Sequence, residues 1–191
     1  MSATGDRRTA LLEAACRMIA LRGVRGLRVD QVAREAEAST ALIYYHFKNR
    51  QGLLAAVVEF VSERAFGYAD APGGRTARDR VIDQLQLEFQ DTDAVIENSA
   101  VWGELRAASV FDRELREVVR EQTGRWVGDL EQAIANGQDE GSFAAAVIAE
   151  DTAVRLTALV EGLAPRWLSG LITTARVHEL LETAVANELD A

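Results

Sequence analysis

Residues 28–50, RVDQVAREAEASTALIYYHFKNR, contain two short helical patterns separated by a tight break. The first pattern has the spacing of one apolar helical face, formed by Val29, Val32, Ala33 and Ala36. After the break at residues 37–38, Ser39 can cap the second helix, because its hydroxyl can accept a hydrogen bond from a free N–H of the first turn. Phe47 closes the second helix as an apolar residue, and Asn49 can cap the helix that follows. This order is typical of a helix-turn-helix, in which the second helix enters the major groove of DNA.

The second of these helices carries large side chains with polar tips, Tyr44, Tyr45 and His46, at successive positions. Aromatic runs often pack in a core, but successive residues turn by about 100° around a helix, so these three cannot all point into one core. At least one of them faces outward, beside the capping Ser39. A tyrosine hydroxyl that bonds a phosphate fixes the register on DNA, whereas Thr40 and Tyr45 are better placed for base edges. We therefore expect this cluster to contact DNA.

The N-terminal third of the chain resembles the TetR family of transcriptional regulators. The resemblance covers roughly residues 1–60 and rests on aromatics, caps and spacing that agree with one another. Its motifs are the helix and glycine of residues 11–23, Val32-Ala33, Ser39, the run IYYHF at 43–47, and Arg50 followed by Leu53-Leu54. The rest of the chain resembles the family only in length and helical pattern, with a weaker match at residues 161–163.

The resemblance implies an all-α fold of about nine helices in two domains. An N-terminal three-helix helix-turn-helix domain would span residues 1–50, followed by a connector helix at about 50–68 and an effector-binding and dimerisation domain at 69–191. It also places Lys48 and Arg50 near phosphates, where the N-terminal dipole of the connector helix adds to the attraction. Arg28 is either a phosphate or minor-groove contact or an ordinary solvated arginine. The residues predicted to bind DNA are Arg28, Ser39, Thr40, Ala41, Tyr44, Tyr45, His46, Lys48 and Arg50.

Three positions depart from the family pattern. Glu37 stands where members usually have a glycine in the turn, so a non-glycine residue would take a left-handed conformation there. Leu42 replaces a usual small hydroxyl residue, and Gly52 replaces a usual acidic residue in the first turn of the next helix. These departures concern the base preference of the protein rather than its fold.

The charge of the chain is unevenly distributed. Its 191 residues carry a formal net charge of −9, which by itself argues against a general nucleic-acid binder. The first 50 residues, however, hold nine basic and five acidic residues, whereas the rest holds 12 basic and 25 acidic ones. A basic N-terminal part on an acidic body suits a protein that meets DNA with one end only, although surface charge also varies along chains that bind no DNA.

Other classes of function find little support in the sequence. Cys16 is the only cysteine, so an intrachain disulfide and a thiolate metal site are excluded, and its helical face predicts a buried thiol. There is no phosphate-cradling glycine motif, no nucleophile–base arrangement and no second metal ligand near His178, so we predict no enzymatic activity, cofactor or metal. No apolar run reaches the ~18 residues of a membrane span and no signal peptide is evident, so we expect no membrane association and a cytoplasmic protein. The alternatives are a helical adaptor or small-molecule-binding protein without DNA binding and, less favoured, an enzyme on a helical scaffold.

The C-terminal part is expected to consist of helices that follow a break at residues 70–74, DAPGG. These helices are expected at about 76–90, 93–108, 112–135, 147–168 and 174–189, and the third should stop at Asn136-Gly137. By resemblance, an effector cavity lies among them. The residues predicted to line it are Phe66, Phe89, Trp102, Arg106 and Trp126, with Glu104 as a further polar anchor. Large rings more often simply fill a core, and that interpretation stays open for each of them.

The last two helices have strong apolar faces. In a monomer these faces would be core, whereas in the resembled family they form a four-helix dimer interface. The residues predicted for this interface are Leu156, Leu159, Gly162, Leu163, Trp167, Val177, Leu180, Leu181, Ala184 and Val185. The expected function is therefore that of a homodimeric transcriptional regulator that binds a roughly palindromic DNA operator. It would act as a repressor that a small-molecule effector releases.

Overall fold

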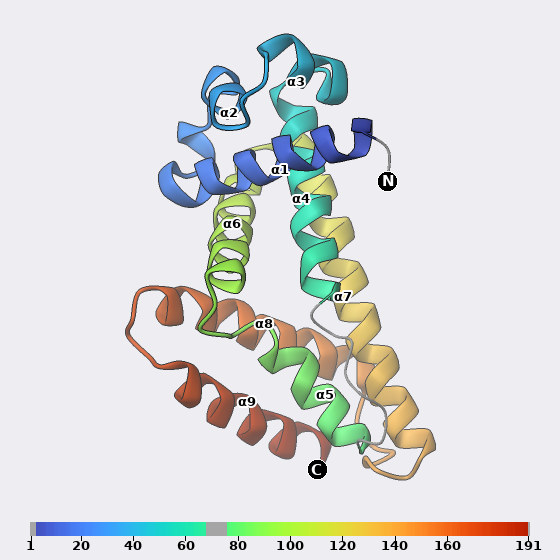
Figure 1. The fold of residues 1–191 in the computed structure, drawn as a ribbon. Helices are drawn as coiled ribbons and strands as arrows, with labels where there is room; N and C mark the ends of the chain where they lie inside the picture. Colours follow the sequence, from blue (N-terminus) through green and yellow to red (C-terminus); the bar gives the residue numbers. More distant parts are fainter. Residues whose placement is uncertain (1–2, 68–75, 191) are drawn as a thin grey trace. The chain divides into compact units, whose positions relative to one another are not determined.

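The computed structural model describes the backbone of residues 3–67 and 76–190 and the side chains of residues 6–65 and 76–190. All regular structure within this part of the chain is helical, as predicted (Figure 1). The elements are α1 (Ala3–Arg22), η1 (Val24–Gly26), α2 (Val29–Glu35), α3 (Thr40–Phe47), α4 (Arg50–Gly67), α5 (Ala77–Gln86), α6 (Asp93–Ser109), α7 (Arg113–Asp139), α8 (Ala149–Leu168) and α9 (Thr174–Leu189). The predicted break at residues 70–74 lies outside the described residues. Among the described helices, none is long and apolar enough to cross a membrane.

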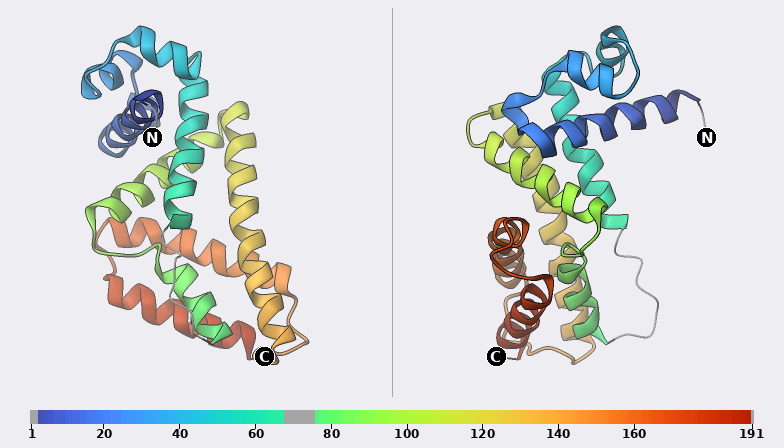
Figure 2. Two further views of the ribbon diagram at one scale, coloured as in Figure 1. Left: turned by 45° about the vertical axis from the view of Figure 1, so that its right-hand side comes forward. Right: turned by 60° about the vertical axis from the view of Figure 1, so that its left-hand side comes forward.

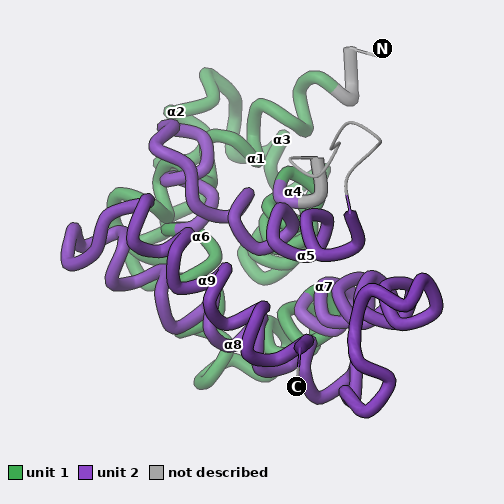
Figure 3. The backbone as a smooth tube through the Cα atoms, turned by 90° about the horizontal axis from the view of Figure 1, so that it is seen from below, with its two compact units in different colours: residues 1–64, 100–122 green, residues 65–99, 123–191 purple. Residues whose placement is uncertain are grey.

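The helices form two compact units that do not follow the order of the chain (Figure 3). Unit 1 consists of Met1–Arg64 and Ala100–Gln122, and unit 2 consists of Ala65–Ser99 and Thr123–Ala191. Three helices, α4, α6 and α7, contribute residues to both units. The end of α6 and the start of α7 therefore belong with the N-terminal helices, although the sequence places them far beyond the predicted domain boundary.

Unit 1 is held together by one apolar core. Helices α1 and α2 lie side by side, as do α2 and α3 (Figures 1 and 2). The thiol of Cys16 is buried in this core, as predicted. Buried side chains of α4, α6 and α7 complete the core: Leu53, Leu54, Val57, Val58, Val61, Val101, Leu105, Leu115 and Val119. Packing of the N-terminal helices thus depends on residues beyond position 100.

Unit 2 has its own core, in which α5, α8 and α9 pack against one another. Phe89 and Trp167 meet edge to face with their ring centroids 5.4 Å apart. The indole Nε1 of Trp167 donates a 2.9 Å hydrogen bond to the Thr174 hydroxyl, which satisfies its polar atom. The ring of His178 is half-buried, and its Nε2 lies 2.9 Å from the Phe89 carbonyl oxygen. This contact gives His178 a structural partner.

The predicted end of α7 at Asn136-Gly137 is wrong, because the helix continues to Asp139. Gly137 does not end the helix but gives space to a ring from the following loop. A Cβ at this position would lie 2.1 Å from a ring carbon of Phe143, which is itself buried in the core of unit 2. The glycine that looks like a helix stop in the sequence is a packing residue in the structure.

Candidate nucleic-acid interface

Helices α2 and α3 are fixed by a few buried apolar side chains and by the turn between them. Val32 of α2 and Ile43 of α3 are fully buried in the unit 1 core, and Phe47 at the end of α3 is almost so. In the turn, Glu37 has a φ of 50°, the left-handed conformation predicted for it. Ser39 caps α3, because its hydroxyl accepts a 3.2 Å hydrogen bond from the Leu42 N–H. The expected helix-turn-helix is therefore present, with its predicted cap.

The outer face of α3 carries side chains that are exposed to solvent. Tyr45 is 76% exposed and Tyr44 is 51% exposed, while Thr40 and Ala41 are exposed at the start of the helix. His46 is half-buried and meets the Tyr45 ring edge to face at 5.1 Å. Of the three successive residues, the two tyrosines therefore face solvent and His46 lies partly against the protein, as helical geometry requires. Their hydroxyls and the Thr40 hydroxyl can donate to and accept from DNA groups.

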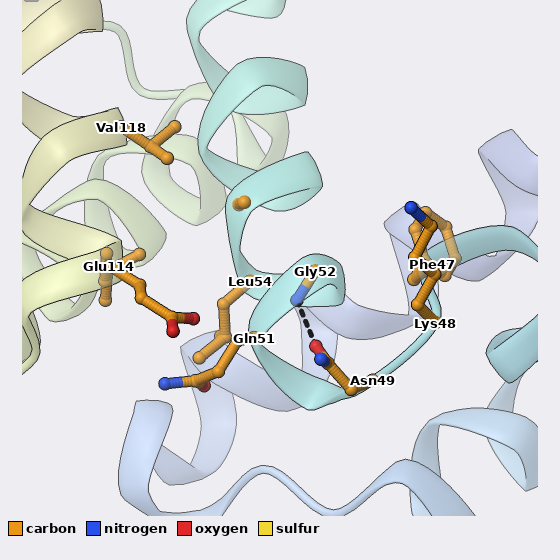
Figure 4. Close-up of a pocket in the computed structure, with 10 residues that line it drawn as sticks. Phe47, Lys48, Asn49, Gln51, Gly52, Leu54, Glu114 and Val118 are labelled. Carbon is orange, nitrogen blue, oxygen red and sulfur yellow. Dashed lines mark hydrogen bonds between the residues drawn. The ribbon is translucent and has the colours of Figure 1, made fainter.

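The turn from α3 to α4 is unusually tight. Lys48 has φ 63° and ψ −49°, and the Asn49 N–H donates to the Phe47 carbonyl at 2.7 Å, which makes a γ-turn centred on Lys48. The Asn49 side chain then caps α4, as predicted, by accepting a 2.8 Å hydrogen bond from the Gly52 N–H (Figure 4). The strained turn leaves the Lys48 side chain exposed at the end of α3.

Gly52 is a residue whose role the sequence reasoning missed. A Cβ on Gly52 would lie 2.1 Å from the Phe47 carbonyl oxygen, the acceptor of the γ-turn. Any larger residue would therefore push against the backbone that positions Lys48. The sequence shows this glycine only as a departure from a family pattern, because its reason is a close approach in space.

Arg50 is placed differently from the prediction. Its guanidinium is half-buried and donates to two backbone carbonyls, with Nη2 2.5 Å from Val24 O and Nε 3.2 Å from Leu27 O. These bonds direct the side chain toward the turn before α2 rather than outward from the start of α4. In this structure Arg50 thus bonds within the protein, and its predicted phosphate contact stays a prediction.

Arg28 is exposed and forms an ion pair on the surface. Its Nε donates to a carboxylate oxygen of Asp30 at 3.2 Å, and Arg34 donates to the other oxygen at 3.1 Å. The bond from Arg28, and secondly the positive charges of both arginines, lower the pKa of Asp30 below its ordinary value. Because the pair is in water, its net contribution to stability is small. The guanidinium remains largely exposed, and the predicted DNA contact of Arg28 stays a prediction.

A hollow of about 260 Å³ lies in unit 1 between the α3–α4 turn and the start of α7 (Figure 4). Leu54 and Gln51 of α4 point toward Glu114 of α7, and Val118 lies further along that helix. Its complete lining is Phe47, Lys48, Asn49, Gln51, Gly52, Leu54, Ala55, Glu114, Leu115 and Val118. The hollow is smaller than usual small-molecule sites, which begin near roughly 300 Å³. None of the residues predicted to line an effector cavity takes part in it.

The residues predicted for the effector cavity are divided between the units. Trp102 and Arg106 belong to unit 1, where the guanidinium carbon lies 5.6 Å from the indole centroid. Phe89 and Trp126 belong to unit 2, where Phe89 is fully buried in the core and Trp126 packs at its edge. The side chain of Phe66 lies outside the described residues. Glu104, the further anchor, instead accepts a 3.1 Å hydrogen bond from the Val24 N–H of η1.

The residues predicted for a dimer interface fall into two groups. Leu159, Leu180 and Ala184 are half-buried at the edge of the unit 2 core, and Gly162 is exposed. The other six are buried in the core of their own chain: Leu156, Leu163, Trp167, Val177, Leu181 and Val185. These six cannot face a second copy while that core is intact, so their assignment is corrected to core. The apolar side chains that α8 leaves at the surface include Val154, 50% exposed, and Leu168, 37% exposed.

Comparison with known proteins identifies both parts of the chain. A family model described as "Bacterial regulatory proteins, tetR family" matches residues 11–57. A second model, described as "BetI-type transcriptional repressor, C-terminal", matches residues 77–190. Among curated proteins, the HTH-type transcriptional regulator BetI of Burkholderia mallei (strain NCTC 10229) is 28% identical over 191 residues, which cover 96% of this chain and 89% of the relative.

Solved structures agree with these matches. A structure described as a TetR-family transcriptional regulator from Rhodococcus sp. is 42% identical, with a TM-score of 0.93 over 97% of this chain and all of the other chain. A structure described as a transcriptional regulator from Saccharomonospora viridis in complex with choline is 25% identical, with a TM-score of 0.85 over 97% of this chain and 98% of the other. The similarity therefore extends over both units.

Proposed function

Because the chain belongs to the TetR family of transcriptional regulators, we propose that α3 reads an operator in the major groove and that the protein is a repressor released by a small effector. DNA binding and regulation of transcription are properties of this family, and they favour the regulator over the adaptor and the enzyme. The proposal depends above all on the exposed surface of α3. Its outer tyrosines are exposed to solvent, while Ile43 and Phe47 are buried in the core on the opposite face.

Within this proposal, Thr40, Ala41 and Tyr45 reach base edges, while Tyr44 and Lys48 bind phosphates on either side of the groove. Fluorescence anisotropy with a labelled duplex from the DNA flanking the protein's own gene tests it. A duplex of equal length and shuffled sequence is the control, and we expect clearly tighter binding to the flanking DNA. Equal affinity for both duplexes at physiological salt would contradict sequence-specific reading.

A single α3 reads only a few base pairs, so the proposal requires a dimer on a roughly palindromic site. Its half-sites would lie one helical turn, ~34–36 Å, or a multiple of it apart. We assign the interface to the exposed side of α8, where Val154 and Leu168 are the large apolar side chains and Gly162 lets a second helix approach. The proposed interface also includes Leu180 and Ala184 of α9, which are half-buried at the edge of the unit 2 core.

For the effector we propose a quaternary ammonium compound. Support comes from the BetI-type C-terminal match and from the choline complex of the Saccharomonospora viridis protein. Such cations bind to the faces of aromatic rings, and Arg106 already places its own cation against the Trp102 ring in this chain. A ligand that favours one separation of the two DNA-binding surfaces changes operator affinity in proportion to its differential affinity for the two states.

Titration of choline into the operator complex tests the effector class. We expect weaker operator binding with choline. We expect no effect from 3,3-dimethyl-1-butanol, which has the shape of choline without the charge. If both compounds act equally, charge is not recognised; if neither acts, the effector belongs to another class while the DNA-binding proposal stands.

A further inference from the structure

The three-residue element η1, between α1 and α2, is held by two side chains that come from distant parts of the chain. Glu104 of α6 accepts a hydrogen bond from the Val24 N–H at 3.1 Å. Arg50 of α4 donates to the Val24 carbonyl at 2.5 Å and to the Leu27 carbonyl at 3.2 Å. The same residue, Val24, is therefore fixed at both its N–H and its C=O.

The chemistry of these bonds makes the contacts directional. The guanidinium of arginine is a rigid fork of donors, so two carbonyls at its Nε and Nη2 define the plane in which it lies. On the other side of the turn, a carboxylate that accepts from a backbone N–H makes a charge-assisted bond, stronger than a neutral one. A lysine could supply a charge in place of Arg50, but it could not reproduce the two-carbonyl fork.

We infer that Arg50 and Glu104 are positioning residues for DNA binding, which hold η1 between α4 and α6 and thereby orient α2 and α3. The inference rests on the proposed function. Leu27 and Arg28 lead directly from η1 into α2, so the position of the turn sets where the helix-turn-helix begins. A movement of the end of α6 relative to α4 would have to break one of the two sets of bonds or carry the turn with it.

Two further contacts join residues 111–112, between α6 and α7, to η1 and to the start of α4. Gln51 of α4 donates a 2.6 Å hydrogen bond to Asp112, the residue that precedes α7. The guanidinium carbon of Arg25, in η1, lies 5.7 Å from the ring centroid of Phe111. Residues 104, 111 and 112 thus contact η1 or the start of α4, so the end of α6 and the turn before α7 both pack beside the segment that leads into α2.

The first test compares Arg50→Lys with Arg50→Ala in operator affinity at several salt concentrations. If Arg50 positions η1, both variants lose affinity, on the order of tenfold, and both keep the salt dependence of the parent. If Arg50 instead binds a phosphate, Arg50→Lys binds like the parent, and Arg50→Ala reduces the log–log salt slope by about 0.9 for each phosphate that the arginine neutralised. That second pattern would overturn the inference.

Two control variants accompany this test. Arg34→Lys makes the same chemical change on the surface of α2, where the side chain bonds only within its own helix, and it should bind like the parent. Lys48→Ala removes a proposed phosphate contact, so it should make the salt slope shallower. Circular dichroism establishes that the folded fraction is equal in all variants compared.

The second test examines Glu104 through backbone amide exchange. Glutamine keeps an oxygen that can accept from the Val24 N–H, whereas alanine does not. Glu104→Ala should therefore accelerate exchange of the Val24 amide and lower operator affinity, and Glu104→Gln, which keeps a neutral acceptor, should lie between Glu104→Ala and the parent in both measurements. Unchanged Val24 exchange in Glu104→Ala, or exchange accelerated without loss of operator affinity, would overturn the role given to Glu104. If the parent bound no operator, the proposed function would fail, while the exchange rates would still show whether the side chains hold the turn.

Discussion

Replacement of Gly52 by alanine tests the geometry of the α3–α4 turn. The added Cβ would lie 2.1 Å from the Phe47 carbonyl oxygen, whereas real Cβ contacts closer than 3.0 Å are essentially never seen. Either the carbonyl or the first turn of α4 must therefore move by about 1 Å. Because that carbonyl accepts the hydrogen bond of the γ-turn, the movement would open the turn and displace Lys48.

The size of the effect follows from two opposing contributions. Alanine in place of a helical glycine gains about 0.5–1 kcal/mol from lower chain entropy in the unfolded state and higher helix propensity. Overpacking against fixed neighbours costs typically about 1–3 kcal/mol, and here the neighbour is backbone, which gives way less easily than a side chain. We expect Gly52→Ala to lower the free energy of unfolding by roughly 1–2 kcal/mol.

Gly124→Ala is the matched control, because Gly124 lies inside α7 and a Cβ there meets nothing within 4 Å. This variant should instead gain about 0.5–1 kcal/mol. Urea unfolding followed by circular dichroism measures both, and operator binding is then compared at equal folded fraction, where Gly52→Ala should bind more weakly. If Gly52→Ala stabilised the protein as Gly124→Ala does, the close approach of Gly52 to the Phe47 carbonyl would be refuted.

Three other predictions concern separate surfaces. Tyr45→Ala should weaken operator binding by roughly 1–3 kcal/mol, with little change on random DNA and none in the melting temperature, if this exposed ring reads a base; an equal loss on both DNAs in titrations would assign it to phosphates. Val154→Glu should shift the protein to monomer in light scattering without unfolding it. A dimer that persisted in this variant would contradict the assignment of the interface to α8. Asp112 accepts from the Leu115 N–H at 3.1 Å, and this bond, followed by that from Gln51, lowers the pKa of its carboxyl below the ordinary 3.8. The carboxylate therefore stabilises the fold above about pH 4 and ceases to do so as the pH falls through the lowered pKa; Asp112→Ala should cost about 0.5–2 kcal/mol in urea unfolding at pH 7 and less at pH 3, and an equal loss at both would show that the charge is unimportant.

The local parts of the site could be predicted because their causes are local. Ser39 and Asn49 cap helices whose free N–H groups lie within three residues of them. Glu37 takes a left-handed conformation because the turn requires one at that position. Tyr44 and Tyr45 face solvent while Phe47 is buried, and helical geometry alone requires these side chains to point in different directions. For these features the sequence neighbourhood contains both partners of each interaction.

The parts that could not be predicted depend on partners far away in the chain. The acceptors of Arg50 are 23 and 26 residues away, and the donor to Glu104 is 80 residues away. An arginine at the start of a helix has the same sequence signature whether it turns toward DNA or toward a carbonyl. Similarly, the apolar periodicity of α8 and α9 shows that one face of each helix is buried, but it does not distinguish the core of the same chain from contact with a second copy.

The division of the chain into units has a consequence for building chimeras. A natural way to exchange operator specificity between relatives would be to cut at the predicted boundary near residue 68 and transplant everything before it. Such a transplant would leave behind Val101, Leu105, Leu115 and Val119, which complete the core of unit 1. The grafted helices would then meet foreign side chains at the end of α6 and the start of α7. A chimera that preserves this protein's DNA-binding surface must therefore include residues 100–122 as well as the N-terminal helices. Two segments that are separate in the sequence have to be transplanted together.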